Sequence, residues 1–162
     1  MKTVLERIEE KLGLEGVAYR VTSHKAVFTS AEAAEARGAT LSSGAKALVM
    51  KAGKSFVLFV VPGDRKLDSK RVKKDMGVRD LRFATREEVL ELTDLETGAI
   101  PPFGSLFGLK TVCDRALGQN LKINFNPGSH TESLGMTFED YVRSERPNLA
   151  DISRSPKRVA SL

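Results

Sequence analysis

The sequence predicts an α+β domain, built as one mixed, strongly bent and barrel-like β-sheet wrapped by short helices. Two aliphatic runs, KALVMK (46–51) and SFVLFVVP (55–62), flank Ala52-Gly53-Lys54, a pattern typical of a tight β-hairpin. The other predicted strands and helices are short, and the long crossover helices of a doubly wound parallel sheet are missing from the pattern. With 162 residues, the chain has the length of one ordinary domain.

Composition favours a globular, cytoplasmic protein. Hydrophobic residues make up 41% of the chain and charged residues 29%, close to the averages for soluble domains. No apolar run approaches the ~18 residues of a membrane-spanning helix. The first residues, MKTVLERIEEKLGLEG, mix acidic and apolar side chains, unlike the layout of a secretory signal peptide. We therefore expect no membrane association.

The first third of the chain predicts two helices separated by a strand. Apolar residues between Val4 and Leu12 recur at helical spacing, and Gly13 is a suitable stop. The stretch VAYRVTS (17–23) alternates as a strand does. Thr29 or Ser30 can cap the alanine-rich helix that follows, and Gly38 can end it.

After the hairpin, short elements continue to the end of the chain. LDSKRVKKDMG predicts a basic helix ending at Gly77, and Thr85 to Glu88 forms a capping-box pattern that opens a helix to about Leu92. The remaining elements are predicted as strands at 81–84, 106–114 and 121–126, a turn at Pro127-Gly128, and a helix opening near Thr137. Beyond Pro147 the periodicity ends, so we expect a domain over residues 1–146 and a loosely held basic tail over 147–162.

Common catalytic signatures are missing. Ala52-Gly53-Lys54-Ser55 ends like a phosphate-binding loop, but Leu48 stands where that motif needs its first glycine. In Gly104-Ser105-Leu106-Phe107-Gly108 the serine is not central, as a nucleophile elbow requires. The single cysteine, Cys113, lies in an apolar strand pattern, and we expect it to be a small buried hydrophobic residue. One cysteine and two separated histidines predict neither a metal site nor a cofactor.

The segment GAIPPFG (98–104) is the most unusual in the chain. Pro101 and Pro102 fix the backbone and remove two amide donors, while Gly98 and Gly104 act as pivots. One interpretation is a stiff connection. The other is a preorganised loop whose backbone meets the polar groups of a ligand directly.

Three side chains have ordinary interpretations when taken alone. His24 and His130 lie in predicted loops, where a histidine is more often structural or solvated than catalytic. Lys46 opens an apolar strand and can simply extend its ammonium to solvent. The residues alone do not decide between a structural and a functional role for His130, because its turn NPGSH is rich in small polar residues.

Taken together in this order, these stretches resemble the YbaK/ProX family, the free-standing relatives of the editing domain inserted in bacterial prolyl-tRNA synthetases. The resemblance runs from about Tyr19 to Val142 and rests on His24, VFTSAEAAEARG, the Lys46 hairpin, FATREEVLELT, GAIPPFG and NFNPGSH. It implies a barrel-like mixed sheet and hydrolysis, in trans, of tRNA charged with a wrong small amino acid. Alanine, cysteine, serine and threonine are all candidates. No cofactor is implied.

The resemblance also implies roles for particular residues. Lys46 matches the family's key lysine and is expected to hold a phosphate or ribose, or to stabilise charge on the ester carbonyl. The backbone of the 98–104 loop is expected to position the ester and the attacking water. The implied catalytic set is Lys46, Gly98, Ile100, Pro101 and Gly104, and the implied substrate-binding set is His24, Pro102, Phe103, Asn126, Gly128 and His130. Ala47 follows Lys46 where many relatives carry threonine or serine.

The charge of the chain suits tRNA as a partner. The net charge is +5, and the helix SKRVKK (69–74) offers phosphate contacts. We expect these from Lys70, Arg71, Lys73 and Lys74, with Arg154, Lys157 and Arg158 of the tail as further candidates. A solvated helix face is an equal alternative. An aminoacyl-tRNA synthetase is a second candidate partner. The competing functions are a non-catalytic module that binds tRNA or a synthetase, and a hydrolase of another small acyl ester.

Overall fold

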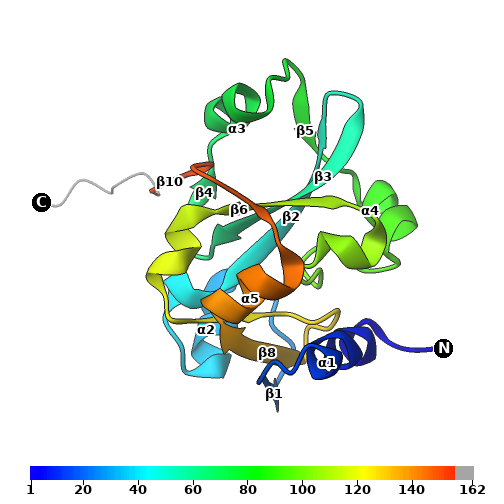
Figure 1. The fold of residues 1–162 in the computed structure, drawn as a ribbon, viewed down its shortest axis with the longest axis vertical. Coiled ribbons are helices and arrows are strands. Elements are labelled where there is room, and N and C mark those ends of the chain that lie inside the picture. Colours follow the sequence, from blue (N-terminus) through cyan, green and yellow to red (C-terminus); the bar gives the residue numbers. More distant parts are fainter. Residues whose placement is uncertain (156–162) are drawn as a thin grey trace, which may run out of the picture.

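The computed structural model describes residues 1–155, which form helices and strands around two apolar cores (Figure 1). The helices are α1 (Val4–Leu14), α2 (Ser30–Arg37), α3 (Ser69–Met76), α4 (Arg86–Thr93) and α5 (Phe138–Glu145). The strands are β1 (Arg20–Ser23), β2 (Ala45–Ala52), β3 (Ser55–Pro62), β4 (Lys66–Leu67), β5 (Leu81–Phe83), β6 (Lys110–Asp114), β7 (Lys122–Phe125), β8 (Glu132–Thr137), β9 (Asn148–Ala150) and β10 (Ser153–Arg154). None of the helices described is long and apolar enough to cross a membrane.

The strands form three sheets. The largest has the order β5-β2-β3-β6-β9, with antiparallel pairs on one side of β3 and parallel pairs on the other. A second sheet, β1-β8-β7, is antiparallel, and β10 pairs with β4. A bridge between Gly44 and Asn124 joins the start of β2 to β7. The predicted α+β class with a mixed sheet is confirmed, although the sheet does not close into a barrel.

Strand β3 is apolar from Phe56 onward because both of its faces are covered. Leu58 and Val60 face a core shared with α1, α4, α5 and the three-stranded sheet. Val57, Phe59 and Val61 face the second core, which α3 and the C-terminal segment cover. Figure 1 shows this arrangement, with α3 (green) and the end of the β2–β3 hairpin on the side opposite α1 and β8.

Local sequence signals set most helix boundaries. Thr3, Thr29 and Thr85 each form a capping box with a glutamate three residues later. Gly38 and Gly77 end α2 and α3 in the left-handed conformation that glycine adopts without strain. The predicted hairpin, the helix starting at Thr29 and the helix opening at Thr85 are confirmed.

Two strand predictions need correction. The strand expected from residue 106 begins at Lys110, because residues 104–107 form a 3₁₀ turn that Gly108 ends at φ 69°. The strand expected from residue 17 begins at Arg20. Strand β8 was not predicted, although Leu134 and Met136 give its buried face the alternation of a strand.

The prediction of a loosely held tail from residue 147 is wrong for its first part. Strand β9 extends the large sheet beside β6, and β10 pairs with β4. Ala150 and Ile152 are buried in the second core, and the Asp114 carboxylate accepts a hydrogen bond from the Ile152 amide at 3.0 Å. The sequence hid this because each strand spans only a few residues. Residues 156–162 lie outside the described part, as do the predicted contacts of Lys157 and Arg158.

We expect Ile152→Ala to lower the free energy of unfolding by about 2 to 5 kcal/mol, because the fully buried side chain leaves a cavity between α3 and the sheet. Leu149→Ala, at a partly exposed position of β9, is the matched control and should cost about 1 kcal/mol or less. Urea unfolding measures both. Equal stability of Ile152→Ala and the wild type would mean that the C-terminal segment is not held in the core.

Candidate functional site

A cavity of about 120 Å³ lies between α2, the start of β2 and the first residues of the GAIPPFG loop. Lys46 borders it from β2, Gly98 and Ile100 border it from the loop, and Asn126 borders it from the end of β7. The structure therefore brings together four of the residues predicted from the sequence.

Helix α2 lines the cavity with one face. Ser30, Ala33, Ala34 and Arg37 lie three or four residues apart, so they share that face. The first three are small and leave room between the helix and β2. Arg37 extends a cation into this space from the last turn of the helix.

The Arg37 guanidinium is held by neutral acceptors. Its Nε donates to Ser133 Oγ at 2.8 Å and its Nη2 donates to Asn126 Oδ1 at 2.9 Å. Within residues 1–155 it forms no ion pair with a carboxylate. Burial lowers the pKa of Arg37 to about 10, which still leaves it charged at neutral pH. The cavity thus contains a fixed positive charge.

Asn126 also fixes the start of the loop. Its Nδ2 donates to the Gly98 carbonyl at 2.8 Å, and the Gly128 amide donates to the Ala99 carbonyl at 2.8 Å. Gly98 has φ 101°, a conformation that other residues rarely adopt. The backbone at Gly98 is therefore held in place from the side of β7.

The second half of the loop lies in the core instead of the cavity. The Tyr141 hydroxyl donates to the Pro102 carbonyl at 2.7 Å, and the fully buried Phe103 ring lies 5.7 Å from that of Phe125. The Gly104 amide donates to Thr111 Oγ1 at 2.9 Å. Pro101 is also buried. Residues 101–104 thus anchor the loop in the core. Their burial disfavours the direct substrate contacts predicted for them.

Lys46 reaches the cavity from β2. Its Nζ donates to the Arg65 carbonyl at 3.2 Å. Partial burial lowers the pKa of Lys46, and the nearby charge of Lys66 lowers it further, while the Asp64 carboxylate acts in the opposite direction. One Asp64 oxygen, Oδ1, is buried and has no hydrogen-bond partner among the described residues.

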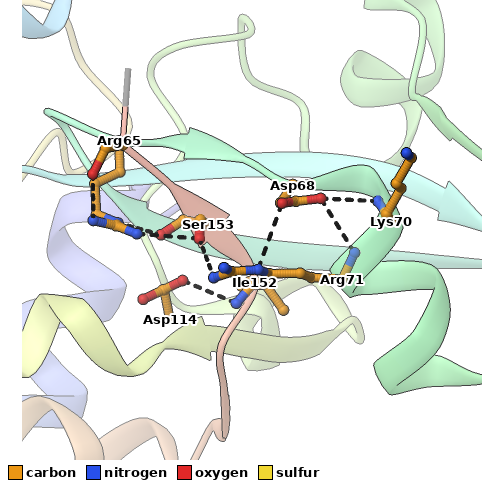
Figure 2. Close-up of polar contacts among 8 residues, drawn as sticks. Arg65, Asp68, Lys70, Arg71, Asp114, Ile152 and Ser153 are labelled. Carbon is orange, nitrogen blue, oxygen red and sulfur yellow. Dashed lines mark hydrogen bonds and ion pairs between the residues drawn. The ribbon is translucent and has the colours of Figure 1, made fainter. Parts of the chain in front are cut away.

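The C-terminal segment positions Arg65, whose carbonyl accepts the hydrogen bond from Lys46. Arg65 Nε donates to Ser153 Oγ at 2.6 Å, and Arg71 Nη1 donates to the Ser153 carbonyl at 2.8 Å. Figure 2 shows both arginines converging on Ser153, with Asp114 holding the neighbouring Ile152 amide. Strand β10 therefore fixes the backbone of the loop that contacts Lys46.

Neither histidine borders the cavity directly. His24 Nδ1 donates to the Lys25 carbonyl at 2.7 Å, since a carbonyl can only accept, and His24 Nε2 shares a hydrogen bond of 2.8 Å with Ser133 Oγ. Because Ser133 also accepts from Arg37, His24 supports the arginine. His130 contacts the Val27 carbonyl at 3.1 Å, and its ring lies 4.8 Å from that of the exposed Phe28 at the cavity rim.

Gly128, a predicted substrate-binding residue, and Cys113 both lie away from the cavity. A Cβ at Gly128 would come within 2.8 Å of Val4, so this glycine packs against α1. Cys113 is buried, and burial raises its pKa to about 12, as expected for an inert thiol. In residues 1–155, no three acidic, histidine or cysteine side chains gather as a metal site would require.

The basic helix α3 is separate from the cavity. Lys70 and Lys74 are exposed and Lys73 is partly exposed. Arg71 is occupied by Ser153 and by an ion pair with Asp68 at 3.5 Å. Arg154 is also exposed. Among the described candidates for phosphate contact, the three lysines and Arg154 are therefore accessible, whereas Arg71 is already engaged.

Comparison with known proteins identifies the family. A family model described as "Aminoacyl-tRNA editing domain" matches residues 24–144. The chain belongs to this family. The resemblance to its YbaK/ProX members, inferred from the sequence motifs, is thereby confirmed.

Relatives of this editing domain include free-standing proteins and parts of ligases. The chain is 34% identical over 155 residues to the "Multifunctional Ser/Thr-tRNA deacylase ProXp-y" of Escherichia coli K12, covering 93% of each protein. It is 32% identical to a proline–tRNA ligase of Bacillus licheniformis, over 70% of this chain and 22% of the ligase. A solved structure of a proposed trans-editing enzyme for prolyl tRNA synthetase superimposes with a TM-score of 0.84 at 28% identity, covering 96% of this chain and 99% of the other.

Sequence reasoning about this editing domain missed Arg37. Its position, one residue before the helix-ending Gly38, is also that of an ordinary basic residue in a last helical turn. The available signal was its helical spacing from Ser30, Ala33 and Ala34, which places it on the face that borders the cavity.

We expect Asp64→Asn to lower the pKa of Lys46, since it removes the negative charge that favours the ammonium form. Lys46 should then lose its proton at a lower pH than in the wild type. NMR titration of ¹³C,¹⁵N-labelled lysine side chains measures this shift. Asp75→Asn, at an exposed position of α3, is the control. An unchanged Lys46 pKa in Asp64→Asn would contradict the electrostatic coupling.

Proposed function

We propose that this protein is a free-standing aminoacyl-tRNA deacylase that hydrolyses the ester linking a small, wrongly attached amino acid to tRNA. The observation that carries the proposal is Lys46 beside a cavity of about 120 Å³ in a chain of the editing-domain family. The match to a Ser/Thr-tRNA deacylase over 93% of both chains supports the same activity.

The need for such an enzyme follows from the limits of binding selectivity. A synthetase pocket separates side chains that differ by one methylene by only about 10- to 200-fold, so small amino acids are attached in error. A second site that accepts only small side chains can remove them. The cavity between α2 and β2 is small enough for this selection, because the residues that border it leave room only for a compact group.

The proposed chemistry needs no protein nucleophile. A water adds to the ester carbonyl, the bond to the ribose oxygen breaks, and the products are the free amino acid and tRNA with its hydroxyl restored. Lys46 stabilises the negative charge that develops on the carbonyl oxygen. The fixed backbone at Gly98 and Ile100 positions the reacting groups. The free hydroxyl of the terminal adenosine carries the proton between the water and the leaving oxygen.

Serine and threonine are the proposed amino acids, because the free-standing relative is named for them. Alanine and cysteine belong to the same size class and form part of the test. A synthetase is the proposed second partner, since similar domains occur within proline–tRNA ligases.

We expect the wild-type protein to deacylate tRNA charged with serine or threonine faster than buffer does, and Lys46→Ala to lower kcat by about 100-fold or more. The assay follows loss of label from tRNAs charged with alanine, cysteine, serine, threonine or proline. Lys51→Ala, at the other end of the same strand, is the matched control. Bound tRNA without accelerated decay of any ester would instead favour a non-catalytic binding module.

The exposed lysines of α3 are proposed to contact the tRNA backbone. We expect Lys70→Ala with Lys74→Ala to weaken tRNA binding and to reduce the log-log salt slope by about 0.7 to 0.9 for each lost contact. Fluorescence anisotropy at several salt concentrations measures the slope. The control pair is Lys110→Ala with Lys122→Ala, also exposed. If the salt slope of tRNA binding were the same for the wild type and for both double variants, α3 would be excluded from the interface.

A further inference from the structure

Arg37 has the features of an anion-binding group. Partial burial weakens its hydration, and its pKa falls to about 10 for this reason. Its hydrogen-bond acceptors are the neutral side chains of Ser133 and Asn126. A charge removed from water is normally paired with an opposite charge, and none of the described carboxylates fulfils this role.

The guanidinium is held rigidly and retains free donors. Ser133 and Asn126 occupy Nε and Nη2, while Nη1 has no hydrogen-bond partner within residues 1–155. Nη1 lies beside Gly44, where a Cβ would be 3.4 Å away. The missing side chain at residue 44 therefore leaves space next to the free donors. Since Ser133 and Asn126 already fix the group, little ordering entropy is lost when it binds a ligand.

The charges of an aminoacylated tRNA end indicate what binds there. That end carries an ammonium on the amino acid and a negative phosphodiester on the 5′ side of the terminal adenosine. Two cations, Arg37 and Lys46, border the cavity and repel the ammonium. A phosphodiester offers two oxygens in the planar geometry that arginine recognises.

We propose that Arg37 binds the phosphodiester on the 5′ side of the terminal adenosine, leaving Lys46 for the ester carbonyl. This inference rests on the proposed deacylase function. It makes Arg37 the group that sets the position of the substrate along the cavity. Asn126 then links the phosphate site to the Gly98 backbone, because the same side chain contacts both.

The test is a cycle that combines a protein variant with a changed substrate. Seryl- or threonyl-tRNA is prepared in two forms. One has the normal phosphodiester on the 5′ side of the terminal adenosine, and the other has a neutral methylphosphonate at that single position. We expect wild-type kcat/KM to fall about 10- to 100-fold on the methylphosphonate. Arg37→Gln should show a similar fall on normal tRNA and little further loss on the methylphosphonate. Arg79→Gln, at an exposed position near α3, should behave as the wild type.

Each outcome separates two questions. If wild-type protein hydrolyses neither ester, the deacylase function fails. If it hydrolyses the normal ester but Arg37→Gln loses the same factor on both substrates, Arg37 does not contact the phosphate and this inference is overturned. Thermal unfolding checks the variants. If Arg37→Gln does not fold, Arg37→Lys replaces it. We then expect this variant to be less sensitive to the methylphosphonate than the wild type. Sensitivity equal to that of the wild type would count against the contact.

Discussion

The geometry of the cavity depends on two hydrogen bonds of the Asn126 side-chain amide. Its oxygen accepts from Arg37 on α2, and its nitrogen donates to the Gly98 carbonyl in the loop before β6. Asn126 follows Phe125, which is buried in the larger core, so its position is set by packing. One amide thus aligns a charged group and a loop that are 61 residues apart in sequence.

The GAIPPFG loop shows how rigidity is divided between support and function. The half from Pro101 to Gly104 is fixed in the core by Tyr141, Phe125 and Thr111. Gly98 and Ile100, in the other half, border the cavity. The interpretation as a stiff connection thus applies to the residues from Pro101 to Gly104, and ligand contact at Gly98 and Ile100 stays a prediction. Because proline restricts the backbone on one side and Asn126 holds it on the other, the proposed binding of substrate would cost this loop little entropy.

Local signals in the sequence predicted local structure well. The hairpin 45–62 and the helices capped by Thr29 and Thr85 depend on neighbouring residues, which can be read directly. Strands β9 and β10 are stabilised by residues far away, such as Asp114 and Arg65, and no periodicity in two or three residues reveals such partners. The same limit applies to the site. Lys46 was found through family motifs, whereas the importance of Arg37 depends on Ser133 and Asn126, some 90 residues further along the chain.

Two cations at one small cavity have an electrostatic consequence for specificity. Burial disfavours the charged forms of both Arg37 and Lys46, so the charges beside this cavity are poorly compensated by the described residues. A substrate that brings negative charge relieves this cost, while a free amino acid at neutral pH brings an ammonium as well as a carboxylate. In the proposed binding mode, attraction favours the nucleic-acid end of the substrate, and the amino acid is selected by size in the remaining space. In that proposal, hydrolysis separates the amino acid from the phosphodiester, so the attraction between the phosphodiester and Arg37 no longer holds the amino acid in the cavity.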